Sequence, residues 1–199
     1  MAISYPVALP THTGIAQIEL RAVNAVAYSQ SPFTFAGQAH AYQGQMWQAE
    51  VSLPPMLTAD AEQWLGFLLS LRGQFGTFLL GDPLRTSLRG TATGVTVTGS
   101  AGDNTVSATV TAGQTLLAGD YIQLGSGSTA ALHKVLVDYT GTGAAADLEI
   151  WPALRVARSA ATATLSNTKG VFRLSSNEQA WSINEASIYG ITFAAREAI

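Results

Sequence analysis

The chain has 199 residues, of which 47% are hydrophobic and only 12% are charged, about half of the ~25% charged residues typical of soluble domains. This balance supports a real core and excludes a disordered chain, which requires low hydrophobicity and a high net charge. The formal net charge of −3 lacks the positive excess typical of nucleic-acid-binding domains, so nucleic-acid binding is not expected as the main function. The low charge also favours a surface that other subunits partly cover.

Cysteine is absent, which excludes disulfides, thiol catalysis and cysteine-based zinc sites and mildly favours folding in a reducing cytoplasm. Residues 1–14 lack the basic stretch and apolar core of a signal peptide. The longest apolar run, residues 64–71, is far shorter than the ~20 residues that span a bilayer, so no membrane insertion is expected.

Composition divides the chain into three parts. Residues 1–89 are rich in aromatic and long aliphatic side chains, residues 90–165 in Gly, Ala, Thr, Ser and Val, and residues 166–199 return to the first style. A composition that changes and later returns to its first type predicts a discontinuous outer domain, residues 1–89 and 166–199, with an inserted domain at residues 90–165.

The first part of the chain predicts strands separated by one helix. Apolar alternation indicates strands over residues 15–23, 33–35 and 45–53, and Pro54 and Pro55 end the last of these. A helix follows, with Thr58 as its cap and Gly73 at its end. A further strand is expected over residues 75–80.

The predicted helix is apolar on more than one side. Its main stripe includes Trp64, Leu65 and Leu68, at the spacing of one helical face. Phe67 and Leu69 lie away from the centre of that stripe. A helix of this kind is deeply buried or shared with a partner, so Phe67 and Leu69 are candidate subunit-interface residues.

The inserted domain is predicted to be entirely β. Short alternating segments separated by Gly-rich turns fit a small barrel or sandwich; they are expected at residues 95–98, 105–110, 121–124, 132–138, 148–151 and 162–165. Strands are also expected at residues 171–174, 179–183 and 188–195, and the last of these should pair with the N-terminal sheet and close the outer domain.

The sequence predicts no catalytic, cofactor-binding or metal site. His12, His40 and His133 have no partner at metal-ligand spacing, and His40 is interpreted as a turn histidine. Asp138 and Asp147 would form a pair if residues 141–143 make a hairpin between them. No base or ligand pattern accompanies them, and they are interpreted as solvated loop carboxylates.

Two aromatic residues of the inserted domain, Tyr139 and Trp151, are candidate glycan contacts. The favoured interpretation is that they fill the sparse core of a small barrel. Four arginines flank the inserted domain and are interpreted as solvated hinge residues or interface charges: Arg85, Arg89, Arg155 and Arg158.

Three stretches together resemble the distal tail protein family of long-tailed bacteriophages. They are residues 35–55 (FAGQAHAYQGQMWQAEVSLPP), residues 61–83 (AEQWLGFLLSLRGQFGTFLLGDP), and residues 118–125 (AGDYIQLG) followed by residues 132–136 and 151–155. The resemblance spans nearly the whole chain. It consists of similar types of residue in a similar order, without catalytic motifs.

The resemblance implies a mainly β fold: a tail-tube-like β-sandwich with one flanking α-helix, plus an inserted small β-barrel of the oligonucleotide/oligosaccharide-binding (OB) type. It implies a homo-oligomeric, hexameric ring at the virion tail tip, assembled in the host bacterial cytoplasm. The ring would join the tail-tube protein to the tail-tip hub protein and the host-recognition parts. The family supplies no catalytic residues and no cofactor.

Other functions remain as alternatives. A tail-tube or tube-terminator subunit also forms rings, although the large inserted domain argues against a plain tube subunit. A carbohydrate-binding module would recognise a host-surface glycan through residues 90–165. A glycan hydrolase would require two placed carboxylates, and the 13 acidic residues show no clustering, so an enzyme is not expected.

Overall fold

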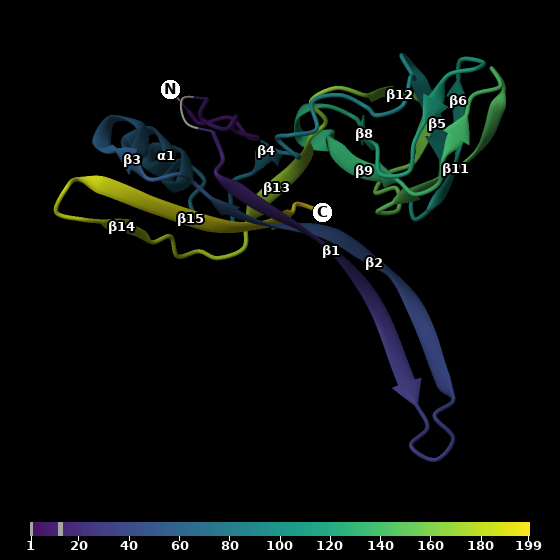
Figure 1. Ribbon diagram of the computed structural model, residues 1–199, viewed down its shortest axis with the longest axis horizontal. Helices are drawn as coiled ribbons and strands as arrows, with labels where there is room; N and C mark the ends of the chain where they lie inside the picture. Colours follow the sequence, from purple (N-terminus) through teal and green to yellow (C-terminus); the bar gives the residue numbers. More distant parts are fainter. Residues whose placement is uncertain (1, 12–13) are drawn as a thin grey trace.

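The protein is described by a computed structural model that covers residues 2–11 and 14–199. It is mainly β, with one α-helix in the described residues, and contains a closed six-stranded barrel. Figure 1 shows three parts: a sheet with the helix beside it, the barrel, and a long two-stranded hairpin that extends away from both.

The outer domain is built on a seven-stranded antiparallel sheet. Its main path follows the order β1 (Gln17–Gln30), β2 (Gly37–Ser52), β15 (Ile188–Glu197), β13 (Gly170–Leu174) and β4 (Phe78–Leu80). The short strands β3 (Met56–Leu57) and β14 (Trp181–Ile183) pair with the first half of β15. The prediction that the last strand pairs with the N-terminal sheet is confirmed, because Phe193 lies opposite Val51.

The helix α1 (Thr58–Ser70) lies against this sheet and supplies much of the core. Trp64 is almost fully buried and contacts the rings of Phe67 and Phe193. The expected cap is wrong by one residue, because Thr58 is already helical and Leu57 occupies the cap position without a side-chain hydrogen bond. Gly73, in the left-handed region at φ +68°, follows the end of the helix as expected.

The barrel closes in the strand order β11-β6-β5-β12-β8-β9. Its strands are β5 (Val95–Gly99), β6 (Thr105–Val110), β8 (Tyr121–Leu124), β9 (Ala131–Val135), β11 (Ala145–Trp151) and β12 (Arg158–Thr164). Two of them turn the corners: β11 pairs first with β6 and then with β9, and β12 pairs first with β5 and then with β8. A ribbon of β7 (Thr115–Leu116) and β10 (Tyr139–Thr140), and a short 3-10 turn η1 (Gly127–Thr129), complete the domain.

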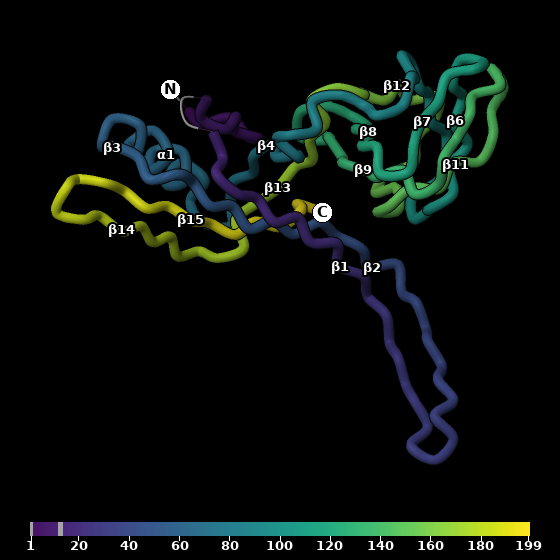
Figure 2. Tube along the Cα trace, in the orientation of Figure 1, coloured from purple at the N-terminus to yellow at the C-terminus, as the bar shows by residue number. Residues whose placement is uncertain are grey.

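The two chain segments that connect the sheet to the barrel run side by side. The backbone N–H of Asn167 donates to the carbonyl of Thr86 at 3.0 Å. Figure 2 shows the outgoing and returning segments crossing together from the sheet to the barrel. Adjacent ends of this kind are the geometry in which a domain can be inserted into another.

Candidate functional site: a projecting arm and the groove at its base

The most unusual feature is the outer part of the β1–β2 hairpin, residues 24–43, which we call the arm. It leaves the body of the molecule and ends in a loop far from the sheet and the barrel (Figures 1 and 2). Beyond a register shift between Asn24 and Val26, the two strands pair with each other from Val26 opposite Ala41 to Gln30 opposite Gly37. The neighbour β15 pairs with β2 only from Gln48 to Ser52.

The arm exposes large apolar side chains. Phe33 is 92% exposed and Phe35 74% exposed, and Val26, Tyr28 and Tyr42 are each more than half exposed. Single exposed apolar residues are ordinary, but five large ones within residues 26–42 are typical of an interaction surface. A free two-stranded hairpin is also only marginally stable in water, so a packed partner would stabilise it.

The arm carries no formal charge. Between Arg21 and Glu50 the sequence contains no Asp, Glu, Lys or Arg. Exposed strands usually carry charges that prevent edge-to-edge association, whereas the centres of protein interfaces are depleted of charge and enriched in aromatic residues. The composition of the arm is therefore typical of a surface that is buried in a protein interface.

The loop at the tip, residues 31–36, has an unfavourable conformation for an apolar residue. Phe35 has φ +56°, in the left-handed region, which a bulky side chain occupies at a cost of about 1–2 kcal/mol. The loop is closed by hydrogen bonds from Phe35 N–H to the Ser31 carbonyl and from Ser31 N–H to the Ala36 carbonyl. Strained residues of this kind are concentrated at functional positions.

A shallow hollow of about 350 Å³ lies at the base of the arm, and we call it the groove. It lies where the register shift bends the hairpin and beside the part of β2 that β15 leaves unpaired. Most of its surface is apolar, and its lining residues include Val23, Ala25, Gly44, Met46, Arg155 and Ile199.

Arg155 introduces little net charge into the groove, because Glu197 neutralises it. A guanidinium nitrogen lies 2.7 Å from Oε2 of Glu197, and both side chains are largely buried. The same carboxylate accepts a hydrogen bond from the Trp47 backbone N–H at 3.1 Å. The Arg155 guanidinium also donates to the carbonyl of Gln45.

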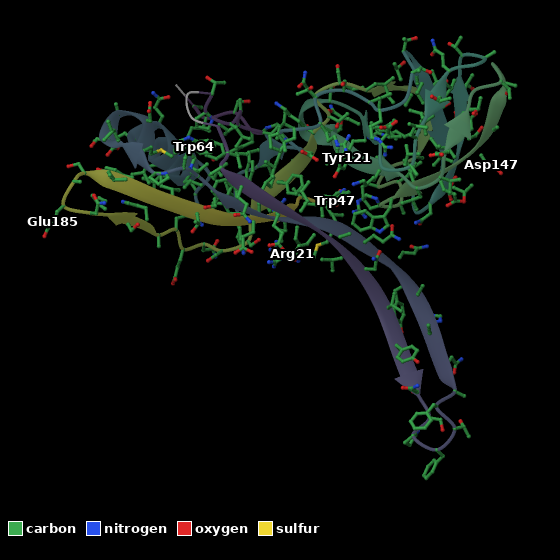
Figure 3. The ribbon with its side chains drawn as sticks, viewed as in Figure 1. Arg21, Trp47, Trp64, Tyr121, Asp147 and Glu185 are labelled. Atoms are coloured by element: carbon green, nitrogen blue, oxygen red, sulfur yellow. The ribbon has the colours of Figure 1, made fainter. Side chains whose placement is uncertain are left out.

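Above the groove, aromatic side chains join the sheet to the barrel. Trp47 of β2 meets Trp151 of β11 edge to face at 4.5 Å between ring centroids and lies 6.1 Å from the ring of Tyr121. Its indole N–H donates to the carbonyl of Leu132 at 2.9 Å. Figure 3 shows Trp47 and Tyr121 at the junction between the two parts.

The candidate glycan contacts are both buried, which corrects that hypothesis at the residue level. Tyr139 lies in the barrel core and its hydroxyl donates to the carbonyl of Ala108 at 2.9 Å. Trp151 packs in the core of the outer domain, not inside the barrel, and its indole N–H donates to Oδ1 of Asn24 at 2.7 Å. A sugar ring cannot stack on either side chain in this structure.

The two candidate interface residues of the helix differ in burial. Phe67 is buried between the rings of Trp64 and Phe78, so the expectation that it meets a neighbouring subunit is corrected. Leu69 points outward and is 60% exposed, and it remains a candidate contact.

The other singled-out polar residues lie apart from one another. His40 is in β2 and not in a turn, with its ring 4.8 Å from that of Tyr42. Asp138 and Asp147 are both exposed and do not face each other across a hairpin, because β10 pairs with β7 and β11 with β6. His12 lies outside the described residues.

The four flanking arginines have different surroundings, and Arg155 is the one that bridges the barrel and the sheet. Arg155 joins the barrel to β2 and β15 through the contacts above, and Arg158 donates to the carbonyls of Leu124 and Thr129. Arg89 donates to the carbonyl of Ala118 at 3.1 Å, and Arg85 is exposed. Their distribution does not form one basic patch.

The sequence interpretation missed the arm, because it read residues 33–35 as a strand and ended the first strand at residue 23. In the structure these residues are the loop at the tip, and β1 continues to Gln30. The signal that could have identified the arm is the long interval without charge between Arg21 and Glu50.

Among the described residues, no group of three or more His, Cys, Asp or Glu side chains is placed to hold a metal ion. The same residues contain no helix with the length and apolar character needed to cross a membrane. Comparison with models of known protein families gives no match, and comparison with curated protein sequences gives none either.

Proposed function

We propose that this protein is a structural subunit of a phage tail that self-associates into a closed ring. The ring would act as a distal adaptor at the tail tip, between the tail-tube protein and the tail-tip hub protein. The observation that carries the proposal is the arm, whose exposed aromatic residues and lack of charge suit burial against another subunit.

The exposed edges of the sheet also support self-association. β1 pairs with β2 on one side only, and β14 pairs only with β15. An unpaired edge is a template for another strand, and a closed ring is one way to cover it. The family resemblance supplies the hexameric symmetry and the tail-tip location of this proposal.

The finer fold hypothesis belongs to the same proposal. A tail-tube-like β-sandwich needs two packed sheets, whereas the described residues of the outer domain form one connected sheet with a helix beside it. An OB-fold barrel has five strands in a partly open arrangement, whereas this one closes with six. The sandwich and the OB-like barrel therefore stay part of the proposal, and the observed sheet and barrel differ from them in these respects.

The proposal assigns no catalytic step to the chain. The burial of Tyr139 and Trp151 removes the two side chains on which the glycan-binding alternative depended. Incubation of the protein with peptidoglycan or capsular polysaccharide should release no soluble sugar. Turnover that a single carboxylate substitution abolishes would contradict a purely structural role.

Negative-stain electron microscopy of the purified protein tests the proposal directly. We expect rings of one size with an open lumen, and we expect them to add to one end of tubes assembled from the cognate tail-tube protein. Images of isolated particles without a lumen would contradict ring formation. Rings that stack into long tubes without a partner would favour the tail-tube alternative.

A further inference from the structure

The geometry points to the groove at the base of the arm as the place where the arm tip of a second copy of this chain binds. This inference rests on the proposed ring and adds the identity of the two surfaces that meet. Each subunit would donate its arm to one neighbour and accept an arm from the other.

The two surfaces have matching chemistry. The tip presents Phe33 and Phe35, both strongly exposed, and the groove presents Val23, Ala25 and Met46. Arg155 is the single Asp, Glu, Lys or Arg side chain among the groove's lining residues, and it is already paired with Glu197. Docking an uncharged tip against the apolar part of the lining therefore removes apolar surface from water and leaves that ion pair intact.

The groove also has a suitable size. The groove is open to solvent and has a volume of about 350 Å³, which leaves room for an aromatic side chain, since an enclosed apolar cavity of about 150 Å³ already holds benzene.

A chain cannot fill its own groove. Ala25 and the tip loop are separated by the length of the paired strands, residues 26–30, and a strand advances about 3.3 Å per residue, which places them more than roughly 15 Å apart. Because the tip and the groove are different surfaces of one subunit, their contact is head to tail. A head-to-tail contact forms a ring when its rotation closes.

Disulfide crosslinking tests the contact without background, because the chain has no cysteine. We would combine Thr34→Cys, which keeps Phe33 and Phe35 at the tip, with Ala25→Cys, oxidise the assembled protein, and analyse it by non-reducing electrophoresis. An intramolecular bond is excluded, since disulfides need Cα atoms within about 7 Å. We expect a ladder of covalent oligomers that stops at the ring size. Each single-cysteine variant can give at most a dimer.

A second measurement uses a substitution that leaves the monomer intact. Phe33→Ser should weaken self-association by about tenfold or more, as for a central aromatic contact, while the dissociated monomer of the variant melts at the same temperature as the wild-type monomer. The matched control is Leu84→Ser, which removes an equally exposed side chain (90%) outside the arm and the groove. It should leave self-association unchanged.

The outcomes separate this inference from the proposed function. Rings that form normally but give no ladder, and that tolerate Phe33→Ser, would overturn the assignment of the groove and leave the ring in place. A protein that stays monomeric under all conditions would overturn both. A ladder together with weakened association in Phe33→Ser supports both.

Discussion

His133 shows how one buried side chain makes stability depend on pH. It is 1% exposed, its Nδ1 lies 2.7 Å from the carbonyl of Pro152, and its Nε2 has no hydrogen-bond partner among the described residues. Burial is the main cause that lowers its pKa from 6.5 to about 4, and the charges of Arg155 and Arg158 lower it further. The folded protein therefore keeps this ring neutral at pH 5.

We predict that the free energy of unfolding falls as the pH decreases from 6.5 to 4. The unfolded chain takes up a proton below about pH 6.5 while the folded chain does not, so acid stabilises the unfolded state. The shift corresponds to about 3 kcal/mol. Denaturant titrations at several pH values measure it, with His133→Gln as the reference that lacks this titration. Parallel curves for the two proteins over this range would refute the prediction.

The ion pair between Arg155 and Glu197 is the second residue-scale feature with a measurable consequence. Arg155→Met leaves the buried Glu197 carboxylate without its cation, which should lower the free energy of unfolding by about 3 kcal/mol. The matched control is Arg21→Met, which breaks an exposed pair with Glu50 and should lower the free energy of unfolding far less, because solvent screens that pair. Equal losses measured by chemical denaturation would contradict the difference in burial.

At the scale of elements, the helix provides a paired comparison. Phe67 is buried and Leu69 is exposed two residues later, so Phe67→Ala should lower the free energy of unfolding by about 3–5 kcal/mol. Leu69→Ala should change it by less than about 0.5 kcal/mol. If Leu69→Ala instead weakens ring formation without a change in stability, its role as a subunit contact is supported. Urea titrations of both variants, with the ring population measured alongside, give the comparison.

The inserted domain offers a second prediction at this scale. The barrel has its own buried cluster, including Val97, Ile122 and Ile150, so residues 88–166 expressed alone should unfold cooperatively. Replacing residues 90–165 with a short Gly/Ser linker should also leave a folded outer domain, because Thr86 and Asn167 are already adjacent and loop closure costs only about 1 kcal/mol. The deletion uncovers Trp47 and removes Trp151 from its core, so the shortened protein should be less stable than the full chain. A molten product, seen by calorimetry, would show that the two parts share one core.

The positions of the helix and of most strands could be predicted from the sequence, but the contacts between distant parts of the chain could not. The strands Thr105–Val110 and Tyr121–Leu124 were predicted to the residue, because short alternating segments between glycine turns are governed by local preferences. The arm was not, because its strands pair only with each other and lack the alternation that a buried face imposes. The burial of Trp151 against Trp47 was also missed, since this contact joins residues far apart in the chain.

The whole molecule consists of three parts with different structural roles: the sheet with its helix, the barrel and the arm. The sheet and helix form a stable body, and the barrel is attached to it through Trp47, Arg155 and their partners. The arm extends from that body with its apolar side chains uncovered. In the proposed ring, head-to-tail association would bury every arm.

Native mass spectrometry of the purified protein decides whether the proposed ring exists, because it counts the subunits in each particle. The account predicts one closed stoichiometry, with six subunits and a mass of about 125 kDa, six times the 20.8 kDa of one chain. At the same concentration, Phe33→Ser should shift the population toward the monomer. A wild-type spectrum that contains only the monomer at tens of micromolar, a concentration scale at which weak association is already visible, would contradict the account.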